Sequence, residues 1–595
     1  MNYNANNVKW DLTVLYPSPD SQELKDEVKF VTEESQKIEA DYKEIFTKGN
    51  FNFSNLKDFF ERTEKIYRKL SKLFMYAYLY QSEDTSNHKA GKLLNEMNTL
   101  SSKIESILVF SKLALSKLSK DEFEELFNKP KLAEYKHFVK LILDEKKYLL
   151  SEPEEKLINL KNISGKKAFL KLLSEFNSAA RYNVEIEGKM KELNDSQVRA
   201  LKTSPDNSLR KKAFELTFKK PYENKIIYTN IYNALVKDWI NESEKREYPS
   251  SISPRNLSNE VSDKIIESLI KVTNENNKLV HKYYKLKAKI MKRDKLLHSD
   301  IYAPLKETST KYTWEEAKNM VLDAMNNFDE EVMKKYKEFF DGNYIHAEIL
   351  PSKRGGAFCF SASPDLHPFV LVNYSGDLND VMTLAHELGH GLHGEISRKQ
   401  NIFNYETPLT TAETASVFSE MIMTDYLLEN IEDKEEKISL IAQKLESMFA
   451  TMNRQNLFTS FELKAHEAIK KEFQSFEDLS DIYLIELKKM FGDSIEYFDF
   501  SSYEWAGIPH IYHTPFYCYA YNFAQLMVVS LYEIYLEKGD SFKEKYLELL
   551  SSGGSDSPEN LLEKLNVDIS KPDFWQRGFD FIKRRFLDKL EELLD

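Results

Sequence analysis

The sequence predicts a mainly α-helical protein: a large multi-helical body with a deep substrate cleft and a small β-sheet beside one helix that carries chemistry. Three observations support this fold class. The chain of 595 residues is long enough for two or three domains, or for one large helical body with a cleft. It contains only 17 Gly and 17 Pro, whereas Lys, Glu and Leu are abundant. Apolar residues also recur at helical spacing along most of the chain.

The first third of the chain is predicted to be a layer of helices. Residues from about 20 to 180 combine charged and apolar residues at helical spacing with few breakers. Residues 183–189 alternate and contain the turn residue Gly188, so we expect a small hairpin there. We take this hairpin as a boundary between an N-terminal helical domain (residues 1–190) and a second domain (residues 191–595).

Helices are expected to continue from the hairpin to about residue 245. Pro249, Pro254 and the serines around them then predict a loop. Residues 259–292 are again helical in pattern.

Two short strands are predicted within residues 344–374. Residues 355–360 and 368–374 are rich in strand-forming residues, and small residues open the first segment. An extended peptide can pair with an exposed sheet edge through its own N–H and C=O groups. If a substrate pairs in this way, the residues that bind it would be Gly355, Gly356, Ala357 and Phe358. An ordinary small sheet that closes the core explains the same pattern equally well.

The segment His386-Glu387-Leu388-Gly389-His390 is the one stretch whose residue types and spacing describe a reaction. Residues four apart lie on one face of an α-helix, so the imidazoles of His386 and His390 can bind a single metal ion. Neutral imidazoles suit zinc, and Glu387 beside them is placed to take a proton from a water that zinc activates. This pattern is the HExxH motif of metallohydrolases.

We expect a helix from about Asp377 to about Arg398 to carry the motif. Asp377 and Asp380 offer an N-terminal cap and an acid in the first turn. Gly389 and Gly391 each cost about 1 kcal/mol against Ala in a helix, which makes sense where other backbone must approach closely. The alternative is a buried helix whose histidines only form hydrogen bonds in the core.

The residues that follow in this helix do not supply a third ligand. A catalytic zinc needs three protein ligands and an open position for water. His393 follows His390 by about one turn and would crowd the same face, so we interpret it as a packing or supporting residue. The metzincin pattern requires glycine at position 393 and histidine at position 396, where this chain has His393 and Ile396, so that class is excluded.

A second helix, starting at about residue 410, is predicted to supply the third ligand. Glu413, Ser416 and Glu420 share one face of it. We take Glu413 as the ligand; the alternative is that Glu413 only forms a capping box with Thr410. Glu420 is better placed to accept the outward N–H of a ligating histidine, which fixes the tautomer of that histidine.

Composition restricts the partners. The formal net charge of -13 argues against nucleic acid and anionic membranes. Charged residues of both signs are interspersed, which is typical of a solvated helical surface. Residues 1–9 lack the apolar core of a signal peptide, and no run of about eighteen apolar residues occurs. Cys359 and Cys518 do not suggest a disulfide framework, and we interpret them as small buried residues. We expect a cytoplasmic protein.

Several segments together resemble the thimet oligopeptidase family of zinc metallopeptidases, and within it the oligoendopeptidase F branch. The resemblance includes the run HELGHGLH at residues 386–393, the run AETAS at residues 412–416, and Glu420. It covers nearly the whole chain, with further similar segments at residues 10–16, 245–248, 353–358 and 508–512. Tyr344-Ile345-His346 departs from the family pattern, because a Trp-Ile-Asp-like triplet is expected there, so no role of that acid is carried over.

The resemblance implies a zinc-dependent endopeptidase that hydrolyses short, unstructured oligopeptides. It implies one zinc ion held by His386, His390 and Glu413, with Glu387 as general base. Residues 191–595 would then form the zinc metallopeptidase catalytic domain. It also favours the substrate-binding interpretation of residues 355–358.

The same resemblance implies that residues 505–521, which are rich in His and Tyr, bind the substrate and stabilise the transition state. Attack on a peptide carbonyl builds negative charge on its oxygen, which imidazole and phenol donors can stabilise. We therefore predict catalytic roles for His510, Tyr517 and Tyr519. The alternative is that Tyr517 and Tyr521, four residues apart, simply pack in a helix.

Two other functions stay open. A helical zinc carboxypeptidase would need a fixed cation for the free C-terminal carboxylate, for which Arg354 is a candidate. A non-catalytic peptide-binding protein would carry the motif without using it. The sequence leaves open the cleavage-site preference, the physiological substrate and the oligomeric state.

Overall fold

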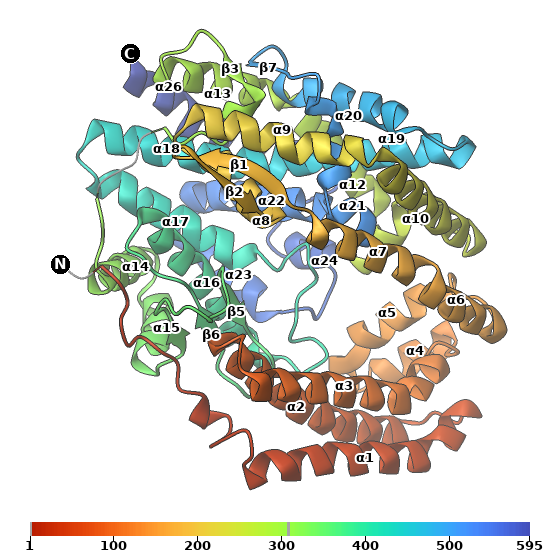
Figure 1. Cartoon of the computed structure of the whole chain (residues 1–595). Coiled ribbons are helices and arrows are strands. Elements are labelled where there is room, and N and C mark those ends of the chain that lie inside the picture. Colours follow the sequence, from red (N-terminus) through yellow and green to blue (C-terminus); the bar gives the residue numbers. More distant parts are fainter. Residues whose placement is uncertain (1–2, 306–309) are drawn as a thin grey trace. The chain divides into compact units, whose positions relative to one another are not determined.

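The computed structural model describes residues 3–305 and 310–595, which form mostly helices (Figure 1). The mainly α fold class is confirmed. By their contacts these residues divide into two compact units, each assembled from three separate stretches of chain. Unit 1 takes the described residues of Met1–Lys147, Ser309–Asn430 and Ile534–Val567, and unit 2 takes those of Tyr148–Thr308, Ile431–Glu533 and Asp568–Asp595. None of the helices within the described ranges combines the length and apolar character needed to cross a membrane.

Unit 1 begins with the predicted layer of helices. Its helices are α1 (Gln22–Thr47), α2 (Phe53–Glu83), α3 (His88–Leu115), α4 (Lys120–Phe127), α5 (Lys136–Lys146), α14 (Trp314–Phe328), α15 (Glu330–Asp341), α16 (Leu378–Ile396), α17 (Thr414–Asn430), α23 (Asp540–Ser551) and α24 (Pro558–Glu563). Helices α1, α2 and α3 pack side by side (Figure 1). Ser21 caps α1 by accepting a bond from the Leu24 N–H, and Asn52 and Asn55 form a capping box at the start of α2. The buried face of the layer is apolar and includes Val31 and Phe60.

Unit 2 contains most of the remaining helices. They are α6 (Glu152–Ser164), α7 (Lys166–Ala179), α8 (Asp195–Ala200), α9 (Asn207–Glu223), α10 (Lys225–Lys245), α11 (Ser253–Ser258), α12 (Asp263–Glu275), α13 (Asn277–Ile290), α18 (Lys434–Phe449), α19 (Gln455–Lys471), α20 (Phe476–Phe491), α21 (His510–His513), α25 (Pro572–Ile582) and α26 (Asp588–Leu594). Helix α22 (Tyr519–Lys538) begins in unit 2 and ends in unit 1. A two-stranded parallel sheet joins β3 (Leu296–Leu297) to β7 (Ile495–Glu496).

The single helical pattern at residues 259–292 is divided in the structure into α12 and α13. Asn276 lies between them with φ −97° and ψ 6°. Its side-chain amide donates to Val272 O (2.9 Å) and to Gln576 Oε1 (2.7 Å). A side chain that bonds nearby backbone competes with helix continuation, and periodicity alone does not reveal such a break.

The hairpin predicted at residues 183–189 is confirmed. Strands β1 (Tyr182–Ile186) and β2 (Lys189–Leu193) pair antiparallel around Glu187 and Gly188, which have φ of 54° and 73°. Positive φ at both central residues is what a two-residue turn of this kind requires. The hairpin lies inside unit 2, and the division of the chain at residue 190 stays a prediction.

Unit 1 contains the small sheet expected beside the motif helix. Strand β6 (Phe369–Leu371) lies between β4 (Ile345–His346), which is parallel to it, and β5 (Phe358–Phe360), which is antiparallel to it, so β5 forms an edge. Strands β5 and β6 both contact α16. The Lys353 ammonium ties the neighbouring loops together by donating to the carbonyls of His346, Glu348 and Val372.

The motif helix is α16, close to its predicted bounds. Asp377 precedes it, and its N–H donates to the Asp380 carboxylate at 3.2 Å. A Cβ added at Gly389 would lie 2.6 Å from Ser416 Cα and 2.8 Å from Ala415 O on α17. The predicted close approach of other backbone is therefore confirmed at Gly389 and wrong at Gly391, where an added Cβ would instead meet the Phe339 ring at 2.4 Å.

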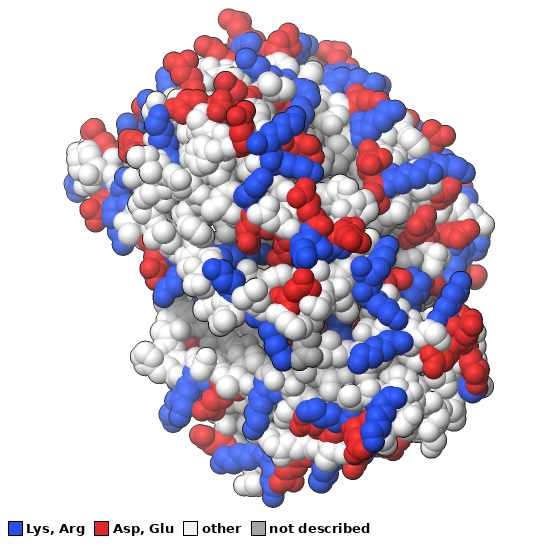
Figure 2. Space-filling model, turned by 90° about the vertical axis from the view of Figure 1, so that its right-hand side faces the viewer, with Lys and Arg blue, Asp and Glu red and all other residues white. Residues whose placement is uncertain are grey.

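The face of the molecule in Figure 2 carries acidic and basic side chains that are interspersed with one another and with uncharged residues. This distribution agrees with the solvated helical surface predicted from the sequence.

Gly389→Ala is expected to lower the stability of the protein, because its methyl group would push α16 away from α17. We expect a loss of roughly 1–3 kcal/mol, the usual cost of overpacking, measured by denaturant unfolding. Gly91→Ala is the matched control: Gly91 lies in α3, and outside the backbone of its own helix no described atom lies within 4 Å of an added Cβ. It should raise stability by up to about 1 kcal/mol through helix propensity. A Gly389→Ala protein at least as stable as wild type would contradict the close-packing argument.

Candidate metal centre

Three side chains of unit 1 converge as a set of metal donors. His386 and His390 lie on α16, and Glu413 directly precedes α17. Glu413 Oε2 lies 3.4 Å from His386 Nε2 and 3.3 Å from His390 Nε2. One donor atom from each residue lies within 4.8 Å of the others. Two imidazoles and a carboxylate at this spacing fit the three protein ligands of a catalytic zinc site.

The start of the second helix differs from the prediction. Helix α17 begins at Thr414, about four residues later than expected, because residues 410–413 form turns. Glu413 therefore does not occupy the third helical position that a capping box with Thr410 would need, and the capping-box interpretation is wrong. The Glu413 carboxylate instead accepts a hydrogen bond from Ser416 Oγ at 2.6 Å.

Glu420 contacts the far side of the first histidine. Its Oε1 lies 2.6 Å from His386 Nδ1, so Nε2 of the same ring is left facing Glu413. A carboxylate in this place fixes the ring tautomer and orientation of a ligating histidine. Glu420 lies on α17, about two helical turns beyond Glu413. Its predicted supporting role is compatible with this contact.

The site favours a positive charge at its centre. Burial opposes charge on His386, but Glu420 above all, then Glu413 and Glu387, raise its pKa to about 9. Burial also opposes ionisation of Glu413, but His390, His386 and Ser416 lower its pKa to about 2. Groups that stabilise a proton's charge at this place would also stabilise a bound cation.

Glu387 is 7% exposed and lies beside the donor set. Burial raises the pKa of its carboxyl, and the two motif histidines and the backbone N–H of Cys359 oppose this rise. A carboxyl with a raised pKa can accept and return a proton closer to neutral pH. The contact with Cys359 was not predicted, because it depends on how β5 packs against α16.

A cavity of about 520 Å³ surrounds these residues within unit 1. Of the predicted substrate-binding residues, Ala357 and Phe358 line it, while Gly355 and Gly356 lie in the preceding loop and are not among its described lining residues. Tyr405 and Glu406 line it without having been predicted. Their segment has no periodic pattern that would have identified them.

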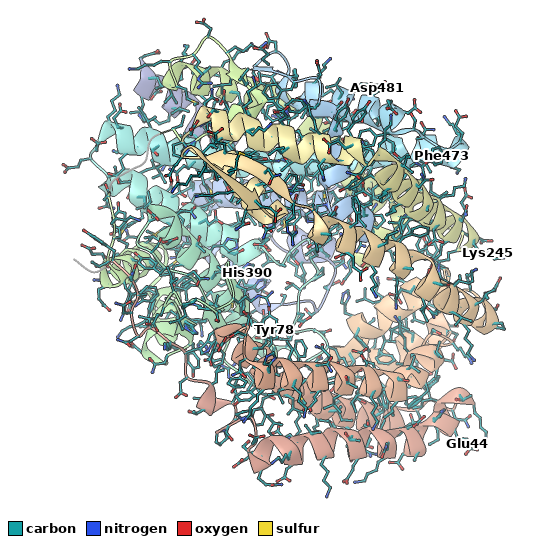
Figure 3. The ribbon with its side chains drawn as sticks, in the orientation of Figure 1. Glu44, Tyr78, Lys245, His390, Phe473 and Asp481 are labelled. Carbon is teal, nitrogen blue, oxygen red and sulfur yellow. The ribbon has the colours of Figure 1, made fainter. Side chains whose placement is uncertain are left out.

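Side chains from α2 also reach this sheet. Figure 3 labels Tyr78 on α2 and His390 on α16. The Tyr78 ring contacts the rings of Phe358 (5.3 Å) and Phe360 (5.2 Å) on β5. The guanidinium of Arg354 lies over Tyr78 at 5.1 Å and over Phe358 at 5.8 Å. Arg354 is thus held by aromatic rings, outside the described lining of the cavity.

Two further histidines of unit 1 lie near acidic or ligating residues. His393 is buried, and burial lowers its pKa to about 4, which agrees with a packing role. Glu338, His367 and Glu395 have donor atoms within 4.8 Å of one another. However, both oxygens of Glu395 already accept hydrogen bonds from Arg398 at 3.1 Å, which balances its charge.

The remaining predicted residues belong to unit 2. His510 on α21 stacks on Tyr517 (5.7 Å, 10°), and Tyr521 contacts both rings, at 6.0 and 5.3 Å. We call His510, Tyr517 and Tyr521 the ring cluster. Tyr519 is fully buried, and its hydroxyl accepts a hydrogen bond from Asn259 Nδ2 at 2.9 Å. The structure therefore brings His510 and Tyr517 together but not Tyr519, whose catalytic role stays a prediction without geometric support.

Several known proteins are similar to this chain in sequence and in fold. The family described as Oligopeptidase F matches residues 115–182. The chain is 29% identical to an oligoendopeptidase F homolog of Borreliella burgdorferi, over 99% of this chain and 98% of that protein, and 27% identical to oligopeptidase PepF of Bacillus subtilis, over 89% and 80%. A crystal structure of a Chlamydophila abortus protein matches with 26% identity and a TM-score of 0.87, over 98% of both chains. Oligoendopeptidase-F from Enterococcus faecium shares the fold, with 24% identity and a TM-score of 0.72, over 96% and 99%. The model described as Peptidase family M3 matches residues 200–581, more than half of the chain, and the chain therefore belongs to peptidase family M3.

Proposed function

We propose that this protein is a zinc-dependent endopeptidase that hydrolyses short, unstructured oligopeptides. The observation that carries the proposal is the convergence of His386, His390 and Glu413 beside Glu387 in one cavity. The names of the relatives, oligoendopeptidase F and oligopeptidase PepF, support the same class of substrate. A location in the cytoplasm is proposed from the sequence.

His386, His390 and Glu413 would hold one zinc ion. When bound, zinc polarises a carbonyl and lowers the pKa of water. Glu420 directs Nε2 of His386 toward the donor set, and Ser416 holds the Glu413 carboxylate by donating to Oε2, the oxygen that faces the two histidines.

Glu387 would act as the general base. It takes the proton of the attacking water and later gives it to the leaving amine as the peptide C–N bond breaks. Its carboxylate is almost fully buried, and the backbone N–H of Cys359 donates a hydrogen bond to it. This hydrogen bond keeps the carboxylate in place in the cavity.

His510 and Tyr517 would donate hydrogen bonds to the oxygen that becomes negative during attack. Two features support this role: the family resemblance of the segment and the stacked arrangement of the ring cluster. Tyr521, the third ring, contacts both, and we include it in the proposed group in preference to Tyr519.

The edge strand β5 would bind the substrate backbone. Ladder bonds to β6 occupy one side of β5, and residues 357–361 line the cavity. Backbone pairing aligns a scissile bond without selecting its side chains. Gly355 and Gly356 would let the loop before β5 approach the peptide, and Gly356 adopts φ 78°, which suits glycine.

Cleavage of a graded-length peptide mixture, followed by mass spectrometry, tests this function. We expect internal cuts in short peptides, loss of activity with a chelator, and no efficient digestion of native globular proteins. Release of only single C-terminal residues would instead favour the carboxypeptidase alternative, with Arg354 as its anchor. Chelator-resistant cleavage would contradict the metal assignment.

Removal of Glu413 is expected to abolish tight zinc binding, because Glu413→Ala deletes one of three protein ligands. Glu420→Ala should weaken zinc binding by only about 10- to 100-fold, since it removes orientation and not a donor. Glu406→Ala is the control: Glu406 lines the same cavity but is not part of the donor set, so zinc should stay bound. Metal analysis after dialysis measures all three, and full zinc occupancy in Glu413→Ala would mean that another group is the ligand.

Glu387→Gln is expected to retain zinc and lose turnover. The amide preserves size and leaves the three ligands intact, but it cannot accept the proton of the water. Metal content and hydrolysis of a quenched fluorescent peptide are measured on the same sample. Activity near that of wild type would refute the assignment of the base.

His510→Phe is expected to lower kcat by about 100- to 1000-fold while KM changes little. The ring is preserved and only the donor is lost, and such a donor acts mainly in the transition state. Steady-state kinetics with a check of metal content measures this. The reverse pattern, a raised KM with kcat intact, would assign His510 to ground-state binding.

A further inference from the structure

The loop between α21 and α22 contains a non-glycine residue in the left-handed region. Phe516 has φ 58°, a conformation that is costly for a residue with a Cβ. The loop leads directly from His510 on α21 to Tyr517 and then to α22. The conformation at Phe516 therefore sets the direction in which the chain presents Tyr517.

The peptide unit between Pro515 and Phe516 is held from both of its polar ends. The Pro515 carbonyl accepts a hydrogen bond from Arg255 Nε on α11 at 3.3 Å. The Phe516 N–H donates to Glu462 Oε1 on α19 at 2.8 Å. Because both groups belong to one rigid peptide plane, the two contacts fix its orientation. We call this pair of contacts the peptide clamp.

Glu462 is an unusual residue to find in this place. It is 0% exposed, and within the described part of the chain its Oε2 has no hydrogen-bond partner. Burial raises the pKa of this carboxyl to about 8, although the Phe516 N–H and Arg255 oppose the rise. Burying a carboxyl with one oxygen unsatisfied costs stability.

The Phe516 side chain is also enclosed. It is 0% exposed, and its ring packs on His466, one turn beyond Glu462 on α19, with ring centroids 4.6 Å apart. Burial lowers the pKa of His466 to about 3, so its ring is neutral and serves as an apolar support. One helix thus holds both the N–H and the side chain of the left-handed residue.

We propose that Glu462 and Arg255 are positioning residues for the ring cluster: by clamping the Pro515–Phe516 peptide they hold Tyr517 against His510. The inference rests on the proposed function, because the ring cluster is assigned there to the oxyanion. The clamp does not contact the reacting atoms. Its effect passes through the loop conformation alone.

The proposal is tested with Glu462→Leu, which removes the acceptor, and Glu462→Gln, whose amide oxygen can still accept from the Phe516 N–H. We expect Glu462→Leu to lower kcat by about 10- to 100-fold, with KM and zinc content nearly unchanged. This loss is smaller than the loss expected when a donor to the oxyanion is itself removed, because Tyr517 is displaced but still present. Glu462→Gln should restore most of kcat. Equal kcat in Glu462→Leu and wild type would overturn the proposal.

Glu486→Leu is the matched control. Glu486 is also buried in unit 2, on α20, and bonds Lys464 and Lys489, not the loop. It should leave kcat unchanged; a similar fall in kcat would show that the effect of Glu462→Leu is general destabilisation. If Glu462→Leu does not fold, Arg255→Met removes the other half of the clamp and carries the same expectation and the same contrary outcome.

A double-mutant cycle separates positioning from packing. In a Tyr517→Phe background, Glu462→Leu should cost much less in kcat than in wild type, because the group it positions is already disabled. Additive losses would overturn the proposal. Glu387→Gln is measured in parallel: if it stays active, the proposed function itself fails, whereas an inactive Glu387→Gln with an additive cycle refutes the clamp alone.

Discussion

The contact between α16 and α17 at Gly389 is the constraint on which the donor set depends. His386 and His390 come from one helix, Glu413 directly precedes the other and Glu420 lies within it, so their distances follow from how closely the two backbones approach. A side chain at Gly389 would separate the helices by more than the few tenths of an ångström that coordination tolerates. The glycine that weakens the helix locally is thus what allows four groups to meet.

Buried charged groups occur both at the donor set and at the peptide clamp. Around the donor set, burial is opposed by opposite charge: Glu420 and Glu413 raise the pKa of His386, and the histidines lower the pKa of Glu413. At the peptide clamp, Glu462 has a backbone N–H and a nearby guanidinium but one unsatisfied oxygen. Both arrangements cost folding free energy that the rest of the core must supply, as functional sites commonly do.

Local patterns allowed much of this site to be predicted. His386, Glu387 and His390 lie within one helix, so their geometry follows from sequence spacing alone. The helix start near Glu413 was misplaced by about four residues, because turns before α17 follow loop geometry that periodicity does not encode. The contact of Tyr521 with His510 could not be read from spacing for a related reason: a left-handed residue at Phe516 and a helix start at Tyr519 decide which rings face His510. The two units, assembled from distant stretches, depend on long-range contacts that no local window contains.

The edge strand β5 is only three residues long, and this short length affects how readily the protein aggregates with other chains. An unpaired strand edge is a template for any extended chain, including an unfolded neighbour or a second copy of the same sheet. In the binding role proposed for β5, its three residues would hold a peptide beside the cavity, but they offer too few ladder bonds to nucleate a growing stack of strands. An edge this short would therefore keep peptide binding reversible, and it would separate the recognition of peptides from their aggregation.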